Sequence, residues 1–414
     1  MNRFRLFVGG CAAVALAAAC TPTGPADSGR YVSTSGTDSG ACSNSASPCL
    51  TITYAVGQAV SGETIHVGAG TFNELVSVTK SLVFEGANAD RSAGVAPQAR
   101  TAESIVKGFR TPGEPHPIAA SGEFSVTVNG FTIDPQGDAA LIAPSTHHLV
   151  ALFGGPQVSV RNNVFNGGNW VADCGYSCTT MTDAAVMVES GTYEVKDNSF
   201  TNFRSPIDVT QFDATHPVVS GTITGNVLTH VTNRGVWVNE YQGGPFPGVI
   251  TISDNHFDST GWTSPDWSPA GIVMTSGGNA VNGNTFTGFG SGVFAQVCDG
   301  TNVASIANSF TGNSFVGNRS GIQFYVAGPC GATVVNATIA DNQFDGGLWS
   351  GAGLTDVAKI GVRWNGDPRP NDLTAECNWW GSSAGADTPG ASTASPGVDT
   401  TPWNVTSTGG CTGT

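Results

Sequence analysis

Basic residues are scarce in this sequence. Its 414 residues include 16 Lys and Arg against 31 Asp and Glu, which gives a formal net charge of −15 at pH 7. Such an acidic surface repels phosphate, so nucleic acid and anionic membranes are poor partners. The 56 glycines argue against long helices and for many tight turns, while a hydrophobic content of 39% still suffices for a long, thin core.

No apolar run is long enough to span a bilayer. The run Phe7–Ala19 follows Arg3 and Arg5, which is typical of an export signal over residues 1–19. Its removal would take the formal charge from −15 to −17, because two of the 16 basic residues leave with it. We expect residues 20–29 to be a linker and residues 30–414 to form a single domain.

The end of the signal leaves two alternatives. Leu16 to Cys20 resembles a bacterial lipoprotein cleavage box, which would lipidate Cys20, and ordinary cleavage near Ala19 is the other reading. In both cases the mature protein is expected outside the cytoplasm, either secreted or lipid-anchored at the cell surface. It would touch a membrane only through Cys20, and we expect a monomer.

No cysteine is left over once Cys11 and Cys20 are set aside. The other eight fall into neighbouring pairs, which are Cys42 with Cys49, Cys174 with Cys178, Cys298 with Cys330, and Cys377 with Cys411. A metal site would need further ligands at short spacings, and these pairs have none. The pattern therefore predicts structural disulfides in an oxidising compartment.

A triplet Asn-x-Phe recurs along the chain. Its asparagines are Asn163, Asn198, Asn226, Asn255, Asn284, Asn313 and Asn342, mostly 29 residues apart, and Asn378 with Trp380 repeats the spacing. A fixed period with one polar and one large apolar position indicates stacked, equivalent rungs. We expect each Asn to occupy a turn that most residues avoid and to bond the next rung, while each aromatic ring stacks inside the coil.

The N-terminal part is expected to cap this coil. Ile52, Ala55, Val56, Ala59 and Val60 fall on one helical face and can cover the open end of the first strands. Those strands are predicted at Thr64–Val67 and Leu82–Phe84, with further ones at Ser125–Val128 and Phe131–Ile133. The polar, Pro-rich stretch Asn88–Pro117 between them is expected to be a surface excursion.

Several stretches carry a family resemblance. Gly70-Thr-Phe-Asn-Glu74, Cys377-Asn-Trp-Trp-Gly-Ser382 and the Asn-x-Phe rungs resemble bacterial right-handed parallel β-helix proteins of the pectate-lyase-like superfamily. The resemblance implies an all-β, right-handed parallel β-helix with an N-terminal capping helix. It implies function only weakly, because that superfamily contains lyases, hydrolases, esterases, epimerases and non-catalytic surface proteins. The catalytic motifs of its pectin methylesterases, polygalacturonases and pectate lyases have no full counterpart here.

A second repeat, a small residue followed by a β-branched one, aligns the rungs of one sheet. If the β-branched residues point inward, the next residues point outward. One outer column is then Met187, Asp208, Trp237, Val273, Phe294, Gln323 and Arg363, and the second is Glu189, Thr210, Asn239, Thr275, Gln296, Tyr325 and Asn365.

Insertions on both margins of this sheet predict a groove. These insertions carry aromatic residues that could stack on sugar rings or, alternatively, pack the loops on the coil. The aromatic residues are Trp170, Tyr176, Tyr241, Phe246, Trp262, Trp267 and Trp349. On the sheet face itself, Trp237 and Phe294 are expected to be exposed. Substrate binding is assigned to Trp237, Asn239, Gln296, Gln323, Tyr325 and Arg363.

Acidic residues concentrate on neighbouring rungs. Glu189 and Asp208 are diagonal neighbours on the sheet, about 7 to 8 Å apart, which fits the carboxyl pair of an inverting glycosidase. The predicted catalytic set is Asp208, Glu189, Glu240 and Arg234, near Asp213, His216 and Arg204. The plain alternative is a solvated network of ion pairs.

Other chemistry stays open at these positions. A lyase would use a cation such as Arg363, beside Tyr325, and calcium held by Asp208, Asp213 and Glu240 is a candidate cofactor. His147 and His148 have no spaced third ligand, so no metal site is predicted there. Two functions are therefore weighed, a carbohydrate-active hydrolase or lyase bound to a polysaccharide, and a non-catalytic scaffold, adhesin or glycan-binding protein at the cell surface.

Overall fold

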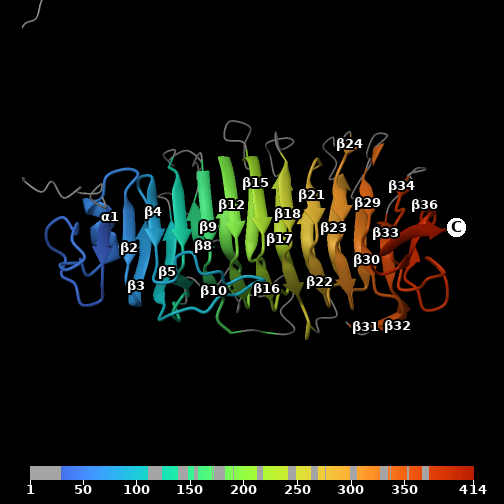
Figure 1. The fold of residues 1–414 in the computed structure, drawn as a ribbon, viewed down its shortest axis with the longest axis horizontal. Coiled ribbons are helices and arrows are strands. Elements are labelled where there is room, and N and C mark those ends of the chain that lie inside the picture. Colours follow the sequence, from blue (N-terminus) through green and yellow to red (C-terminus); the bar gives the residue numbers. More distant parts are fainter. Residues whose placement is uncertain are drawn as a thin grey trace, which may run out of the picture.

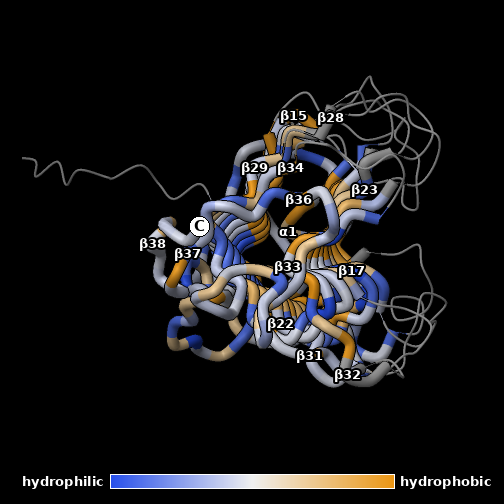
Figure 2. Tube along the Cα trace, turned by 90° about the vertical axis from the view of Figure 1, so that its right-hand side faces the viewer, coloured by the Kyte–Doolittle hydropathy of each residue, from blue (hydrophilic) through white to orange (hydrophobic). Residues whose placement is uncertain are grey.

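The computed structural model is an elongated coil of parallel strands (Figure 1). It describes residues 29–110, 124–138, 148–152, 157–169, 171, 182–189, 191–211, 218–240, 249–262, 269–275, 277–298, 305–326, 334–335, 337–351, 354–365 and 373–414. Within these ranges no helix is long and apolar enough to cross a membrane. Viewed from the end, the strands of successive rungs stack behind one another (Figure 2).

Three ladders of parallel strands form the walls of the coil. Sheet A has eleven strands, β1 (Arg30–Val32), β2 (Thr64–Val67), β4 (Leu82–Glu85), β6 (Val126–Asn129), β9 (Gln157–Arg161), β12 (Gly191–Lys196), β15 (Val218–Thr224), β18 (Ile250–Ser253), β21 (Ala280–Asn282), β25 (Ser309–Thr311) and β29 (Thr338–Ala340).

Sheet B carries the face on which the candidate site was predicted. Its strands are β3 (Gly70–Ser77), β5 (Ser104–Arg110), β8 (His148–Leu152), β11 (Ala184–Val188), β14 (Ile207–Gln211), β17 (Arg234–Glu240), β20 (Ala270–Met274), β23 (Ser291–Cys298), β27 (Ser320–Val326), β33 (Ile360–Asn365) and β35 (Thr393–Ala394).

Sheet C is the short-stranded wall that carries the aromatic triplets, and β5 links it to sheet B. Its strands are β7 (Thr132–Ile133), β10 (Val164–Asn166), β13 (Ser199–Thr201), β16 (Val227–Thr229), β19 (His256–Asp258), β22 (Thr285–Thr287), β26 (Ser314–Val316) and β30 (Gln343–Phe344). Four strand pairs lie outside the three walls, β24 (Ser305–Ile306) with β28 (Val334–Val335), β31 (Leu348–Gly351) with β32 (Leu354–Ala358), β34 (Leu373–Thr374) with β36 (Val398–Asp399), and β37 (Trp403–Thr406) with β38 (Gly409–Gly413).

The predicted asparagine column is confirmed as a continuous buried ladder. In each rung from Asn163 to Asn342 the backbone N–H donates to the side-chain oxygen of the next ladder asparagine, at 2.9–3.0 Å, and the last acceptor is Asn378. The side-chain amide nitrogen of Asn284, for example, donates to the carbonyl of Ile252 and to Asn313. These bonds satisfy backbone groups that the turn leaves without a strand partner.

The prediction that the ladder asparagines themselves hold the unusual turn is wrong. The left-handed backbone belongs to the residue before each of them, namely Asn162, Asp197, Gly225, Asp254, Gly283, Gly312, Asp341 and Cys377, with φ between 55° and 68°. Gly, Asn and Asp tolerate that conformation best, which explains their frequency at this position. The ladder asparagine follows it and supplies the side-chain hydrogen bonds.

The aromatic column is also confirmed. Phe257, Phe286 and Phe315 stack with ring centroids 4.8 and 5.1 Å apart, and Phe344 and Trp380 continue the column. This stack explains the glycines at the start of the sheet B strands. A β-carbon added at Gly271 would lie 2.4 Å from the ring of Phe286, so the corner of the coil has no room for a side chain.

A short helix lies at the N-terminal end of the coil (Figure 1). Helix α1 (Ile52–Gln58) begins after Thr51, whose hydroxyl accepts from the backbone N–H of Tyr54, and it buries Ile52, Ala55 and Val56. Val60 was predicted on the same face, but it follows the helix and is 61% exposed. The role of α1 in covering the end of the coil stays a prediction.

The stretch 88–117 is only partly the surface excursion that was expected. Residues Ser104–Arg110 form strand β5, which buries Val106 and Phe109 in the core. The preceding residues run along a corner of the coil, where the backbone N–H groups of Ala93 and Val95 donate to the carbonyls of Asp197 and Gly225. This segment therefore straps successive rungs together, while residues 111–117 lie outside the described part.

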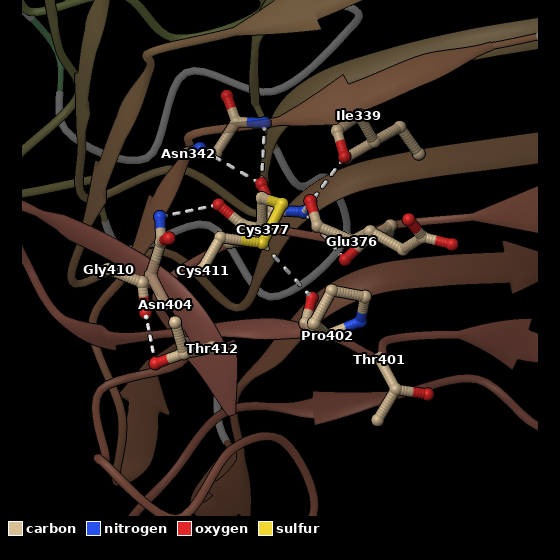
Figure 3. Close-up of a disulfide and its surroundings, with 12 residues drawn as sticks. Ile339, Asn342, Glu376, Cys377, Thr401, Pro402, Asn404, Gly410, Cys411 and Thr412 are labelled. Carbon is tan, nitrogen blue, oxygen red and sulfur yellow. Dashed lines mark hydrogen bonds between the residues drawn. A yellow bond between two sulfur atoms is a disulfide. The ribbon is translucent and has the colours of Figure 1, made fainter. Parts of the chain in front are cut away.

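Two of the four predicted disulfides are confirmed. Cys42 is bonded to Cys49, and Cys377 to Cys411, which ties the C-terminal hairpin β37–β38 to the last rung (Figure 3). Cys174, Cys178, Cys330 and the side chain of Cys298 lie outside the described residues, so those two pairings stay predictions.

One buried hydroxyl in sheet A gives a test of core packing. The side chain of Tyr193 is 4% exposed, its ring lies against Gly221, and its hydroxyl has no hydrogen-bond partner in the described part of the chain. Burial accordingly raises the pKa of Tyr193. We expect Tyr193→Phe to leave the free energy of unfolding unchanged or to raise it by about 1 kcal/mol, because the desolvated hydroxyl is removed.

Denaturant unfolding of both proteins would measure this change. A loss of about 1 kcal/mol or more in Tyr193→Phe would contradict the prediction, because it would mean that an internal water or another group bonds the hydroxyl.

Candidate functional site

The outer face of sheet B has the register that the sequence predicted. Asp208 pairs with Met187 on one side and with Trp237 on the other. The column continues through Val273, Phe294, Gln323 and Arg363. In the second column Thr210 pairs with Asn239, and Gln296 with Tyr325. Glu189 directly follows Val188, and Val188 pairs with Val209 on the next strand. This register places Glu189 diagonally to Asp208.

Much of this face is more enclosed than the sequence suggested. Asp208 is 8% exposed and Glu189 is 5% exposed, and Thr210 and Asn239 are buried beside them. Trp237 and Phe294 were expected to be exposed, yet both are only partly exposed. The candidate carboxyl groups are therefore desolvated, and the plain alternative of a fully solvated ion-pair network does not describe them.

Burial changes the proton affinity of Asp208. The pKa of this carboxyl rises to about 6, chiefly because burial disfavours the charged form. The hydroxyl of Thr210 donates to Asp208 Oδ1 at 2.6 Å, and this bond together with the positive charge of Arg234 opposes the rise. The negative charge of Asp183 adds to it.

Arg234 and Arg204 are each held in a defined position. The guanidinium carbon of Arg234 lies 3.6 Å from the centroid of the Trp237 ring, which is a cation–π contact. Arg204 is buried and forms an ion pair with Asp183 at 3.0 Å, one rung away. Sequence reasoning missed Asp183, although the alignment of Ala185 with Pro206 places Asp183 level with Arg204 and could have found this pair.

Several predicted residues cannot be placed against the site. Strand β17 pairs the backbone of Glu240 with Gln211, but the side chain of Glu240 lies outside the described residues, as do Asp213, His216 and His147. Among the residues that are described, no group of three His, Cys, Asp or Glu could hold a metal ion. Two of the three calcium ligands considered are not covered by that search, so calcium stays a prediction.

The predicted margin aromatics divide into two groups. Trp262 and Trp349 are buried, at 8% and 6% exposure, so these two rings serve packing. The other five, Trp170, Tyr176, Tyr241, Phe246 and Trp267, lie outside the described part of the chain. The rings on the sheet face itself are Trp237, Phe294 and Tyr325, and the last two lie 5.5 Å apart.

The C-terminal rungs of the same face carry polar and basic groups. Gln323 is buried, and its side-chain oxygen accepts from the hydroxyl of Ser291 at 2.9 Å. Arg363 lies beside it on β33 and is partly exposed, as are Gln296 and Tyr325. The predicted substrate-binding residues are thus all on one sheet face, spread over five rungs.

A hollow that was not predicted lies on another wall. It has a volume of about 500 Å³ and is lined by residues of the first rungs of sheet A, including Tyr31, Ser33, His66 and Glu85. The ring of His66 stacks on Tyr31, and its Nδ1 lies 3.2 Å from a carboxylate oxygen of Glu85.

Comparison with known proteins defines the class of this chain. The family model described as the right handed beta helix region matches residues 183–359. Together with the long parallel sheets, the match shows that this is a right-handed parallel β-helix protein. Searches of the curated proteins and of the solved structures found no significant match.

Proposed function

We propose that this β-helix is a carbohydrate-active enzyme that hydrolyses a polysaccharide lying along the outer face of sheet B. The observation that carries the proposal is the buried carboxyl of Asp208, whose pKa is raised to about 6. A general acid works best when its pKa lies near the working pH, since it must hold a proton and release it during the reaction. Asp208 would protonate the leaving oxygen of the glycosidic bond.

Glu189 is the natural partner in this scheme. Its diagonal position predicts a separation from Asp208 of about 7 to 8 Å, and inverting glycosidases keep their two carboxyl groups roughly 6.5 to 9.5 Å apart to admit a water molecule. Glu189 would then act as the base that activates this water. Arg234 and Glu240, on the next strand of sheet B, would complete the catalytic set.

Substrate binding would use the side chains that follow along the face. Trp237, Phe294 and Tyr325 present partly exposed rings that can stack on sugar rings. Asn239, Gln296 and Gln323 offer amide groups for the hydroxyls of the sugar. Such a mixture of apolar rings and a few polar groups is typical of ligand sites.

A panel of plant, algal and bacterial glycans tests the proposal. A hydrolase releases new reducing ends without ultraviolet absorbance, whereas a lyase also leaves an unsaturated, absorbing product. Reducing ends from any glycan, lost in Asp208→Asn and Glu189→Gln, would support the assignment. Full activity in the protein that carries both changes would refute it.

Glycan binding without turnover is the second candidate. The low exposure of Asp208 and Glu189 favours it, because a carboxyl at 8% or 5% exposure offers little surface to a sugar oxygen. A wild-type protein that is inactive across the whole panel but binds one of the glycans would favour this reading, and a surface scaffold or adhesin would then be the function.

Replacement of Trp237 tests whether this residue contributes to substrate binding or to the catalytic step. We expect Trp237→Ala to raise KM by about 10-fold or more with little change in kcat, since loss of a stacking ring removes binding that substrate and transition state share. Steady-state kinetics on the active glycan would measure both constants. A fall in kcat alone would instead indicate that the contact between Trp237 and Arg234 positions the catalytic groups.

A further inference from the structure

The outer face of sheet A carries small, uncharged side chains on its last five strands, β15, β18, β21, β25 and β29. The outward residues form two columns in register, which are Thr222, Thr251, Ala280, Ser309 and Thr338, and Thr224, Ser253, Asn282, Thr311 and Ala340. The residues two positions before the first column are also small and uncharged, namely Ser220, Val249, Gly278 and Ala307. All of these residues are at least partly exposed, and together they define the uncharged face.

The uncharged face is a bounded patch and not a property of the whole wall. On the preceding strand, β12, the same two columns hold Glu194 and Lys196. At the corner of the coil beyond the second column, Asp254 and Asp341 are exposed. The lack of charge is therefore local, in a protein whose formal net charge is −15.

The polar groups of this face are held at fixed spacings. The hydroxyl of Ser253 donates to that of Thr224 at 3.1 Å, and the hydroxyl of Thr311 donates to the side-chain oxygen of Asn282 at 2.7 Å. The β-branched side chain of Thr has few rotamers, which restricts the hydroxyl further. The strands below them lie side by side along the coil (Figure 1) and stack behind one another in the end view (Figure 2).

The size and the chemistry of the uncharged face argue against the usual partners of a protein surface. Its four register steps span about 19 Å along the coil, and its three columns span about 13 Å across it, which gives an area of about 250 Å². A stable dimer buries about 800 Å² on each partner, so a second copy of the chain is a poor candidate. The face also has no aromatic ring to stack on a sugar and no charge to attract an ion.

The grid of side chains resembles the lattice of ice. Side chains repeat every ~4.8 Å from strand to strand and every ~6.6 Å along a strand, because alternate residues point the same way. In ice each oxygen bonds four neighbours tetrahedrally, so bonds of ~2.75 Å place oxygens that share a neighbour ~4.5 Å apart and give a repeat of ~7.3 Å across the layers. The two grids agree to within about a tenth in both directions. Over four steps along the coil the mismatch sums to about 1.2 Å, which is less than half a hydrogen bond.

We propose that the uncharged face of sheet A binds the surface of an ice crystal. The hydroxyl and amide groups of its Thr, Ser and Asn residues bond water molecules of one lattice plane, and the methyl groups of Thr and Ala lie between those bonds. Each contact is weak, but all of them form together because the side chains are already ordered in the free protein. A charged side chain would disrupt the contact, since it keeps a hydration shell of its own.

The growth of ice in solutions of the full chain tests this proposal. Nanolitre osmometry measures the gap between melting and freezing points, and frozen thin films give the rate of recrystallisation. We expect wild type to open such a gap, to give faceted crystals and to slow recrystallisation. Thr251→Lys places a charge at the centre of the face and removes a hydroxyl, so at least ~10-fold more of this variant should be needed for the same effect.

The matched control is Thr285→Lys. Thr285 is partly exposed on β22 of sheet C, so the same change is made on another wall of the coil and should leave ice growth as in wild type. Unfolding midpoints verify that both variants are folded. Ice growth unaffected by wild type at its limit of solubility, or equal effects of the two variants, would overturn the inference. A wild-type dimer in sedimentation that Thr251→Lys dissociates would also overturn it, because it would assign the face to a second copy.

Ice binding lies on a wall other than sheet B, so it does not depend on the proposed function. It is measured without a glycan, and an inactive glycan panel leaves its outcome unchanged. Conversely, Thr251→Lys should turn over the glycan identified by the panel as wild type does, whether or not the face binds ice.

Discussion

Replacement of Asp208 by asparagine should abolish turnover and at the same time stabilise the fold at neutral pH. Asparagine keeps the size of the side chain and can still accept from Thr210, but it cannot give up a proton. Loss of a general acid typically costs about 10²- to 10⁴-fold in rate. Steady-state kinetics on the glycan identified by the panel would measure this loss.

The gain in stability follows from the raised pKa. Ordinary Asp titrates near 3.8, whereas folding raises the pKa of Asp208 to about 6. Between these two values the folded protein binds more protons than the unfolded chain, so its stability falls as the pH rises through this window. The shift of roughly two units corresponds to about 3 kcal/mol, which Asp208→Asn should recover above pH 6.

Denaturant unfolding at two pH values isolates this effect. At pH 8 the variant should be the more stable protein by up to about 3 kcal/mol, and near pH 4, where the wild-type carboxyl is also neutral in the folded state, the two proteins should be alike. A variant that is less stable than wild type at pH 8 would mean that the charged carboxylate is stabilised by groups around it. That result would remove the physical basis for an acid at this position.

Phe286→Ala should have the largest effect on the fold. Phe286 is fully buried, and its ring stacks on Phe257 at 4.8 Å and on Phe315 at 5.1 Å. Truncation opens a cavity with packed neighbours above and below, and such a cavity in a rigid ladder collapses poorly. We expect a loss of about 3 to 5 kcal/mol in the free energy of unfolding.

The chain itself supplies the control for this prediction. Leu228 occupies the same column between Phe200 and Phe257, in register with both, so the stack accepts a leucine. Phe286→Leu should therefore cost clearly less than Phe286→Ala. Denaturant unfolding compares the three proteins, and equal losses in both variants would show that ring stacking rather than filled volume sets the stability of the column.

The candidate site was predictable in its register but not in its burial. Asp208, Trp237 and Arg363 were placed in one column because the repeat of small and β-branched residues fixes which residue follows which on successive strands. The low exposure of Asp208 and Glu189 could not be inferred, because burial depends on the neighbours that folding brings to a side chain from elsewhere in the chain. The burial of Trp349 could not be inferred from the sequence either. Trp349 was expected on the margin of a groove, but it is buried, and its neighbour Arg319 is distant in sequence.

The repeated asparagines and aromatic residues by themselves determined the architecture, since a ladder forms wherever identical side chains recur at the length of one turn of the coil. They also determined the alignment of the sheet B columns, because parallel strands keep their register from rung to rung. Only the tertiary structure decided that the carboxyl of Asp208 is buried, with its pKa raised to about 6, and that Arg204 forms an ion pair with Asp183 of another rung. Proton affinity and ion pairing depend on burial and on charges brought together from separate rungs, and these distances are set by packing and not by spacing along the chain.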